Sequence, residues 1–147
     1  MITSLVGAGS SGCVIANRLT GDADTTVLLL EAGGPDSKPG IHAPSAWLSL
    51  LGTDVDWNYV TEADPRLNGR ENVWPRGKVL GGSSSINAMV YIRGHRLDYE
   101  RWRQLGNEGW SYSEILPYFL KSEDNQRGAS EFHGSGGPLS VTDNPSP

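Results

Sequence analysis

Short apolar runs and glycine-rich turns alternate through the first thirty residues. An apolar segment from Ile2 to Val6 precedes a glycine turn, and apolar residues then recur at near-helical spacing from Ser10 to Thr20, with Gly21 as the expected C-cap. A second apolar run, Val27 to Leu30, is continuous, as expected of a strand covered on both faces of a parallel sheet. This order of strand, helix and strand predicts a βαβ unit and an α/β fold.

The pattern weakens between residues 35 and 75, where prolines and scattered aromatic residues show little periodicity. We expect a helical turn at Ala46 to Leu51 and a short strand at Asn58 to Thr61. A segment of this length without strong elements is uncommon in a compact domain unless it is functional. The alternatives are a functional segment, such as a cofactor lid or a subunit contact, and a simple surface excursion.

Helical spacing returns beyond residue 95. Asp98 to Leu105 has the apolar face of an amphipathic helix, and Ser113 is the expected N-cap of a helix from Glu114 to Lys121. That start would place Pro117 in the first turn, where its missing N–H is harmless. Gly134 to Val141 reads as a turn followed by a strand.

Composition and charge restrict the class of protein. The chain has 147 residues, a net charge of −5 and no basic run, so nothing attracts it to nucleic acid or anionic lipid. No window reaches the roughly 18 apolar residues of a membrane span, and the N-terminus does not have the pattern of a secretion signal. The single cysteine, Cys13, suits a reducing cytoplasmic setting and is expected to be buried.

Chemistry-bearing residues gather at the first glycine turn. Gly7, Gly9 and Gly12 have the G-x-G-x-x-G spacing between a predicted strand and a predicted helix, as in dinucleotide-binding folds. There the pyrophosphate lies at the helix N-terminus. Glu31 ends the second apolar run, where this fold places the carboxylate that binds the adenosine ribose. The residues fit FAD or NAD, and an ordinary βαβ turn is the alternative without a ligand.

A second glycine-rich stretch runs from Arg76 to Gly94 and reads R-G-K-V-L-G-G-S-S-S-I-N-A-M-V-Y-I-R-G. Its Gly81-Gly82 turn and the serines after it offer N–H and O–H donors to phosphate oxygens or to the polar edge of a flavin ring. The alternative is a glycine turn with Ser83 capping a short helix.

The two glycine-rich stretches together resemble the N-terminal part of the glucose–methanol–choline (GMC) family of FAD oxidoreductases, in particular its choline dehydrogenase-like alcohol dehydrogenases. The resemblance extends to the later pieces G-W-S-Y-S-E-I-L-P-Y-F-L-K-S-E and F-H-G-S-G-G-P-L-S-V. It implies a Rossmann-like FAD-binding region at residues 1–94, incomplete and carrying the irregular insertion 35–75. Residues 95–147 would then be the truncated start of a substrate-side region.

The same resemblance implies the cofactor contacts, which we expect to be made with FAD. Those to the pyrophosphate and ribose would come from Gly7, Gly9, Ser10, Ser11, Gly12, Glu31 and Ala32. The rest of the cofactor would lie along Val79, Gly82, Ser83, Asn87, Ala88, Met89 and Val90, the last four beside the isoalloxazine ring. Ser85-Ile86-Asn87 stands where some relatives carry a flavin-linking histidine, so the FAD is expected to be non-covalent.

The implied activity is removal of a hydride from the carbon of a small-molecule alcohol, with an electron acceptor that the sequence does not identify. We assign no catalytic residue, because the family's catalytic histidine lies near the C-terminus of the full enzyme. His42, His95 and His133 lack metal-ligand spacing, so we expect surface or turn residues and no metal site. The alternatives are an NAD-dependent dehydrogenase and a non-catalytic nucleotide-binding module, and self-association into a homo-oligomer is left open.

Overall fold

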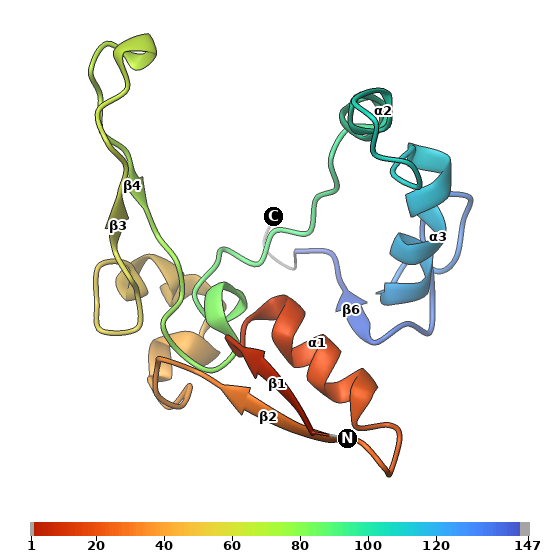
Figure 1. Cartoon of the computed structure of the whole chain (residues 1–147), viewed down its shortest axis with the longest axis horizontal. Helices are drawn as coiled ribbons and strands as arrows, with labels where there is room; N and C mark the ends of the chain where they lie inside the picture. The colour runs from red at the N-terminus through yellow and green to blue at the C-terminus, as the bar shows by residue number, and fades with distance from the viewer. Residues whose placement is uncertain (1, 145–147) are drawn as a thin grey trace. The chain divides into compact units, whose positions relative to one another are not determined.

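The computed structural model describes residues 2–144. The chain divides into two compact units, residues 1–90 and residues 91–147, which are described separately (Figure 1). The division follows Val90, within the second glycine-rich stretch, whereas the sequence analysis placed the boundary after Gly94.

The first unit begins with the predicted βαβ arrangement. Strand β1 (Ile2–Val6), helix α1 (Ser10–Leu19) and strand β2 (Thr26–Leu30) follow in order, and the two strands pair in parallel from Ile2↔Thr26 to Val6↔Leu30 (Figure 1). The α/β prediction is confirmed. The C-cap of α1 is Thr20 and not Gly21, because the Thr20 hydroxyl and N–H both donate to the Ala16 carbonyl.

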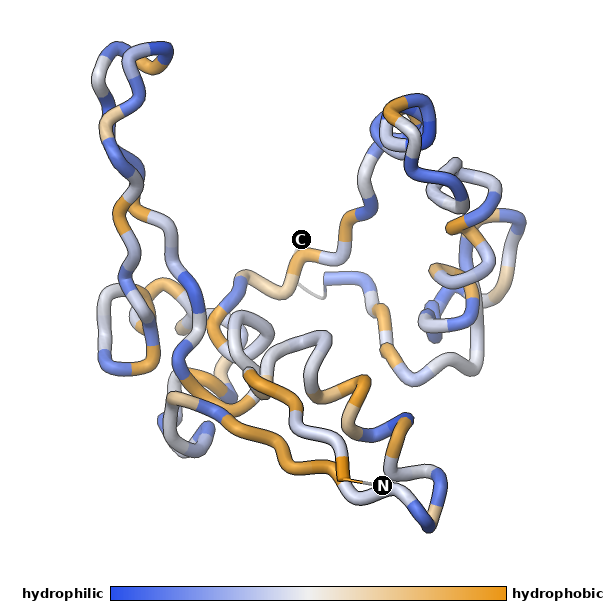
Figure 2. The backbone as a smooth tube through the Cα atoms, in the orientation of Figure 1, coloured by the Kyte–Doolittle hydropathy of each residue, from blue (hydrophilic) through white to orange (hydrophobic). Residues whose placement is uncertain are grey.

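Apolar side chains of this unit are more exposed than the sequence predicts. Figure 2 shows hydrophobic residues along both strands, and Leu28 and Leu30 of β2 are 50% and 47% exposed. The expectation of a strand covered on both faces is therefore wrong for the described residues, whose sheet here has two strands. Cys13 is also exposed rather than buried, with its thiol donating to the Ala8 carbonyl at 3.2 Å.

The irregular segment contains several short elements, and a β-bridge between Gly34 and Val79 joins its two ends. Two 3₁₀ helices, η1 (Pro39–His42) and η2 (Pro44–Leu50), precede an antiparallel hairpin of β3 (Tyr59–Val60) and β4 (Val73–Trp74), with η3 (Pro65–Leu67) near its tip. The predicted helical turn and short strand are both present. The core beneath is made of Leu50, Val55, Val79 and Ile86.

The second glycine-rich stretch forms one short helix, η4 (Gly82–Ser85). Its N-cap is Gly81, in a left-handed conformation at φ +89°, so the expected cap Ser83 lies inside the helix. Glycine adopts that conformation without the steric cost that a side chain would add. This explains why the helix is capped at Gly81, two residues before the expected cap Ser83.

The second unit contains helices α2 (Arg96–Gln104) and α3 (Tyr112–Ser122) and a parallel pair of short strands, β5 (Glu123–Asn125) and β6 (Leu139–Val141). The helix predicted at 98–105 and the strand predicted near the end are both found. Helix packing is aromatic, with the buried Tyr99 ring in edge contact with Trp102 and Phe119 at 5.5 and 6.0 Å between ring centroids.

Helix α3 starts two residues earlier than predicted. Ser111, not Ser113, is its N-cap, and Glu114 completes the capping box by accepting from the Ser111 N–H at 3.0 Å. Pro117 consequently lies in the second turn instead of the first, where its missing N–H removes one helical hydrogen bond.

Candidate functional site

The first glycine turn brings α1 against the end of β1. Gly7 has φ +93°, and its N–H donates to the Leu30 carbonyl at 2.7 Å. A Cβ on Gly12 would lie 2.0 Å from the Gly7 carbonyl oxygen, so only glycine permits the helix to approach the turn this closely. The first turn of α1 carries no acidic side chain. No side chain in that turn therefore compensates the positive end of the helix dipole, which can attract an anionic ligand.

Glu31 follows β2 and points back to this turn. Its Oε2 accepts from the Ala8 N–H at 2.8 Å and its Oε1 from the Gly33 N–H at 2.9 Å. The carboxylate therefore fixes the glycine turn to the end of β2, a role that sequence spacing does not reveal. Each oxygen has a further lone pair with which a ribose hydroxyl could bond.

The second glycine-rich stretch packs directly on the first. The Gly81 N–H donates to the Ala8 carbonyl at 2.7 Å. A Cβ on Gly82 would lie 2.7 Å from the Gly9 Cα, so the two backbones touch at a pair of glycines. The two stretches, which lie far apart in the sequence, therefore meet at a single place in the structure.

An open hollow of about 780 Å³ lies at this junction, within the range of small-molecule sites. Nine of its lining residues are ones that the sequence analysis assigned to the cofactor: Gly7, Gly9, Ser10, Ser11, Gly12, Glu31, Ala32, Gly82 and Ser83. The others are Val6, Leu30, Trp57, Tyr59, Arg76 and Gly77.

The remaining predicted cofactor residues do not line the hollow. Val79 is fully buried in the core, so a cofactor contact there would have to come from its backbone. Residues 87–90 form an exposed loop in which the Asn87 side chain accepts from the Met89 N–H at 2.8 Å, with Met89 at φ +53°. The roles of Val79, Asn87, Ala88, Met89 and Val90 stay predictions.

Asp56 holds together the wall of the hollow formed by Trp57, Tyr59, Arg76 and Gly77, none of which was predicted to contact the cofactor. This carboxylate is 6% exposed and accepts from the N–H groups of Gly52, Asn58 and Arg76 at 2.9, 3.0 and 2.9 Å. Burial alone would raise the pKa of Asp56, but the three N–H donors outweigh it and lower the pKa. The available sequence signal was an aspartate two residues before Asn58, the spacing of an Asx turn.

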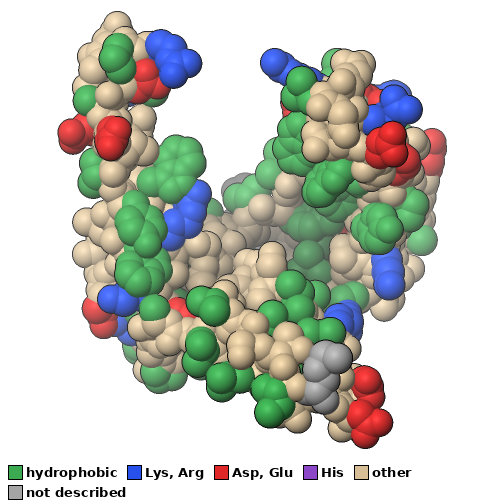
Figure 3. Space-filling model, in the orientation of Figure 1, with side chains coloured by type: hydrophobic (Ala, Val, Ile, Leu, Met, Phe, Trp, Pro, Cys, Tyr) green, Lys and Arg blue, Asp and Glu red, His purple; other side chains and the backbone are tan. Residues whose placement is uncertain are grey.

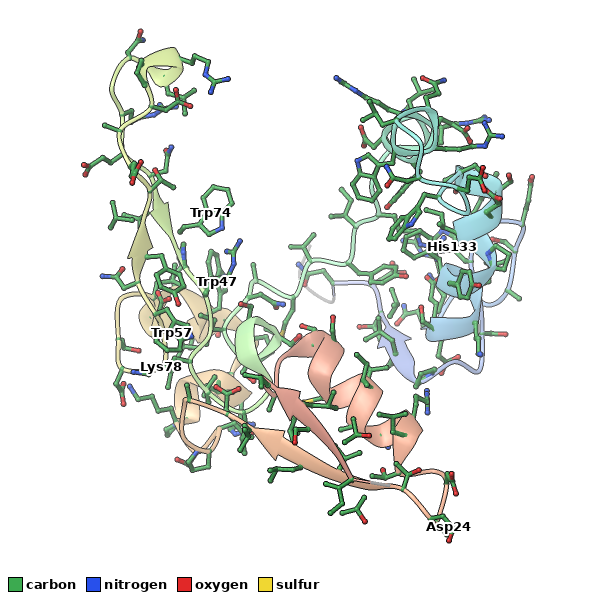
Figure 4. The ribbon with its side chains drawn as sticks, in the orientation of Figure 1. Asp24, Trp47, Trp57, Trp74, Lys78 and His133 are labelled. Carbon is green, nitrogen blue, oxygen red and sulfur yellow. The ribbon has the colours of Figure 1, made fainter. Side chains whose placement is uncertain are left out.

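Aromatic and cationic side chains alternate near this wall. The rings of Trp57 and Tyr59 stack at 5.7 Å, and the Lys78 ammonium lies 4.8 Å from the Trp57 ring centroid (Figure 4). The Arg76 guanidinium lies 5.2 Å from the Trp74 ring centroid. In Figure 3, basic side chains adjoin hydrophobic ones along the part of the chain that carries β3 and β4.

The second unit contains a buried ionic cluster around Glu123. This side chain is fully buried, Arg93 forms an ion pair with it, and His133 Nδ1 lies 2.9 Å from its Oε1 (His133 is labelled in Figure 4). His133 is therefore more than the surface or turn residue expected, because its ring contacts a buried carboxylate. His42 and His95 are exposed, as expected, and His95 caps α2.

Burial by itself opposes ionisation of Glu123, but hydrogen bonds and charge dominate. The donors are the side chains of Asn125 and His133 and the Gly134 N–H, and the attracting charge is that of Arg93. Together they lower the pKa of Glu123 from 4.5 to about 2. The carboxylate is thus ionised at neutral pH and serves as an anchor within the second unit.

No group of three or more histidine, cysteine, aspartate or glutamate side chains within residues 2–144 could hold a metal ion. No helix there is long and apolar enough to cross a membrane.

Known proteins match nearly the whole length of this chain in sequence. Over 146 residues the chain is 51% identical to mitochondrial choline dehydrogenase of Homo sapiens, covering 94% of this chain and 25% of that protein. It is 51% identical over 142 residues to an alcohol dehydrogenase [acceptor] of Pseudomonas putida, covering 95% of this chain and 26% of that protein. The chain thus spans about a quarter of the length of these relatives.

A solved structure shares the fold as well. The crystal structure of pyridoxine 4-oxidase from Mesorbium loti superposes with a TM-score of 0.85 at 44% identity, covering 95% of this chain and 27% of that one. A family profile described as GMC oxidoreductase matches residues 3–147. From this match, together with the paired glycine stretches and the hollow between them, it follows that the chain belongs to the GMC oxidoreductase family.

Proposed function

We propose that this chain is the FAD-binding part of an oxidoreductase that acts on the CH–OH group of alcohols. Membership in the GMC family implies FAD. The observation that carries the proposal is the contact between the two glycine-rich stretches, which forms a hollow around the N-terminus of α1. The NAD alternative finds no support in the family match or in the relatives.

The residues present fit the cofactor. At Gly12 and Gly82 a side chain would collide with backbone, so only glycine lets the turn and the second stretch close around the helix N-terminus, where a pyrophosphate belongs. Ser10, Ser11 and Ser83 line the same hollow and can donate hydroxyl groups to phosphate oxygens. Glu31 would accept from the ribose hydroxyls while it holds the Ala8 N–H.

Bound FAD would supply the acceptor for the hydride of the alcohol carbon. The work of the residues in this chain is then to bind and orient the cofactor. No histidine lines the hollow among the described residues, and we assign no group here as a catalytic base. The names of the relatives suggest choline, other alcohols and pyridoxine as substrates to test.

The experiment is to purify the protein in its full natural length and measure flavin absorbance and stoichiometry, with NAD and FAD compared as ligands in titrations. Reduction of an electron-accepting dye should then depend on an alcohol from a panel that includes choline and pyridoxine. A protein that binds NAD in preference to FAD, or that reduces the dye with no alcohol of the panel, would contradict the proposal.

Non-covalent attachment of FAD is a finer part of the same proposal. Ser85, Ile86 and Asn87 offer no histidine to bond the flavin. Acid precipitation should release all the flavin to the supernatant, and colour retained in the washed pellet would count against it. A cytoplasmic location and a homo-oligomeric state also stay predictions, which cell fractionation and light scattering would test.

A further inference from the structure

The hollow presents a charge imbalance if a diphosphate lies at the glycine turn. The donors from the first stretch are neutral backbone N–H and serine O–H groups, and Glu31 adds a negative charge on the same lining. Among the described residues that line the hollow, Arg76 carries the one positive charge. Burying two phosphate charges without a partner is costly, so this arginine matters for the anion.

The backbone of Arg76 is fixed beside the turn. Its N–H donates to the buried Asp56 at 2.9 Å and its carbonyl accepts from the Trp57 N–H at 2.8 Å. At the next residue, a Cβ on Gly77 would lie 2.1 Å from the Gly82 carbonyl oxygen. The backbone that carries Arg76 is therefore held against Gly82 with no room to shift.

The side chain keeps donors for a ligand. The guanidinium lies against the Trp74 ring, and Nη1 donates to the Pro75 carbonyl at 2.6 Å. A guanidinium has five N–H donors in a planar fork that matches two phosphate oxygens. Lys78 comes two residues later and lies over the Trp57 ring, but it does not line the hollow.

We propose that Arg76 binds the diphosphate of the cofactor as its counter-cation, with Asp56 as the positioning residue that holds the arginine at the hollow. This inference rests on the proposed function and gives a role to Arg76, the first residue of the second glycine-rich stretch, which is not among the predicted cofactor residues. It assigns the irregular segment 35–75 a purpose, because that segment carries the carboxylate on which Arg76 depends.

The test compares ADP with adenosine, which lacks the diphosphate, by calorimetric titration of the protein in its full natural length. Arg76→Gln should lower ADP affinity about 10- to 100-fold, the loss of a charge-assisted hydrogen bond, and leave adenosine affinity unchanged. The salt dependence of ADP binding should also decrease. Lys78→Gln removes the same charge nearby and should leave both affinities unchanged, while Arg76→Lys should retain part of the ADP affinity.

Asp56→Asn tests the positioning role. It should weaken ADP binding less than Arg76→Gln does, and the combined variant should lose no more than Arg76→Gln alone. An equal loss of ADP and adenosine affinity in Arg76→Gln, or no loss of either, would overturn the role of Arg76. Absence of FAD and ADP binding by the unmodified protein would instead remove the proposed function itself.

Discussion

The Glu31 carboxylate has two roles: it accepts hydrogen bonds from two backbone N–H groups, and it lines the hollow. Glutamine at this position has one oxygen, so either the Ala8 or the Gly33 N–H would face an NH₂ group. We expect Glu31→Gln to weaken FAD binding by about 1–3 kcal/mol, measured by titration with flavin fluorescence. Glu62→Gln, at an exposed acid, is the control. Equal affinities in the two variants would remove Glu31 from the cofactor site.

Glu123 makes the second unit sensitive to acid. Because its folded pKa of about 2 lies below 4.5, its ionisation stabilises the fold fully above pH 4.5. That stabilisation should be lost progressively as the pH falls from 4.5 toward 2. Glu123→Gln should lower the free energy of unfolding at pH 7 by on the order of 3 kcal/mol, because Arg93 loses its buried partner.

Urea unfolding of the wild type and Glu123→Gln at pH 7, 5, 4 and 3 checks this prediction. The difference between the two proteins should shrink at the acidic end, while the exposed control Glu131→Gln should follow the wild type at every pH. A difference that is constant with pH would show that packing rather than ionisation of Glu123 provides the stability.

At the scale of elements, the junction between β2 and the second glycine stretch has no spare space. A Cβ on Gly33 would lie 2.1 Å from the Lys78 carbonyl, whereas a Cβ on the adjacent Gly34 meets nothing within 4 Å. Gly33→Ala should therefore destabilise the first unit by on the order of 1–3 kcal/mol and weaken FAD binding, since the strand must move. Gly34→Ala is the matched control.

Thermal unfolding and FAD titration of both variants provide the measurement. We expect Gly34→Ala to be close to the wild type in both. Identical behaviour of the two alanine variants would mean that the contact between Gly33 and Lys78 contributes nothing to the site.

Elements encoded by neighbouring residues could be predicted from the sequence. Apolar periodicity gave β1, α1 and β2 within a residue or two, because local hydrophobic pattern decides them. The start of α3 was missed although Ser111 and Glu114 have the spacing of a capping box. Ser111 and Ser113 are both possible N-caps, and the helix begins after Ser111 because Glu114, three residues later, completes its capping box.

Contacts between distant residues could not be predicted. The hydrogen bond from Arg76 to Asp56 spans 20 residues, and that between Arg93 and Glu123 spans 30. No periodicity records such pairs, since each depends on how intervening loops close. The glycine residues of the site were predictable from motif spacing, whereas its aromatic and basic wall was not.

The molecule as a whole carries much exposed apolar surface. Val6 of β1 is 87% exposed and Leu28 of β2 50%, in a sheet of two strands. We expect the 147-residue chain by itself to bind FAD weakly and to oxidise no alcohol, since holding the two glycine stretches together costs loop entropy that this packing offsets only in part.

The measurement is FAD titration of the 147-residue chain and alcohol-dependent dye reduction, with the protein in its full natural length as the positive control. Tight stoichiometric FAD binding by the 147-residue chain would contradict the prediction, and so would alcohol-dependent dye reduction by it.

The β-bridge between Gly34 and Val79 affects how the segment between them can evolve. It closes the irregular segment at its base, with the Leu80 N–H donating to the Gly34 carbonyl at 3.0 Å, while the hairpin turn at Asn68 and Gly69 lies exposed at the far end. Each doubling of a flexible loop costs only about 0.6 kcal/mol. We expect extra residues inserted at that turn to leave the hollow at the glycine turn intact, so descendants of this gene can lengthen the hairpin and acquire new surface contacts without rebuilding the proposed nucleotide site.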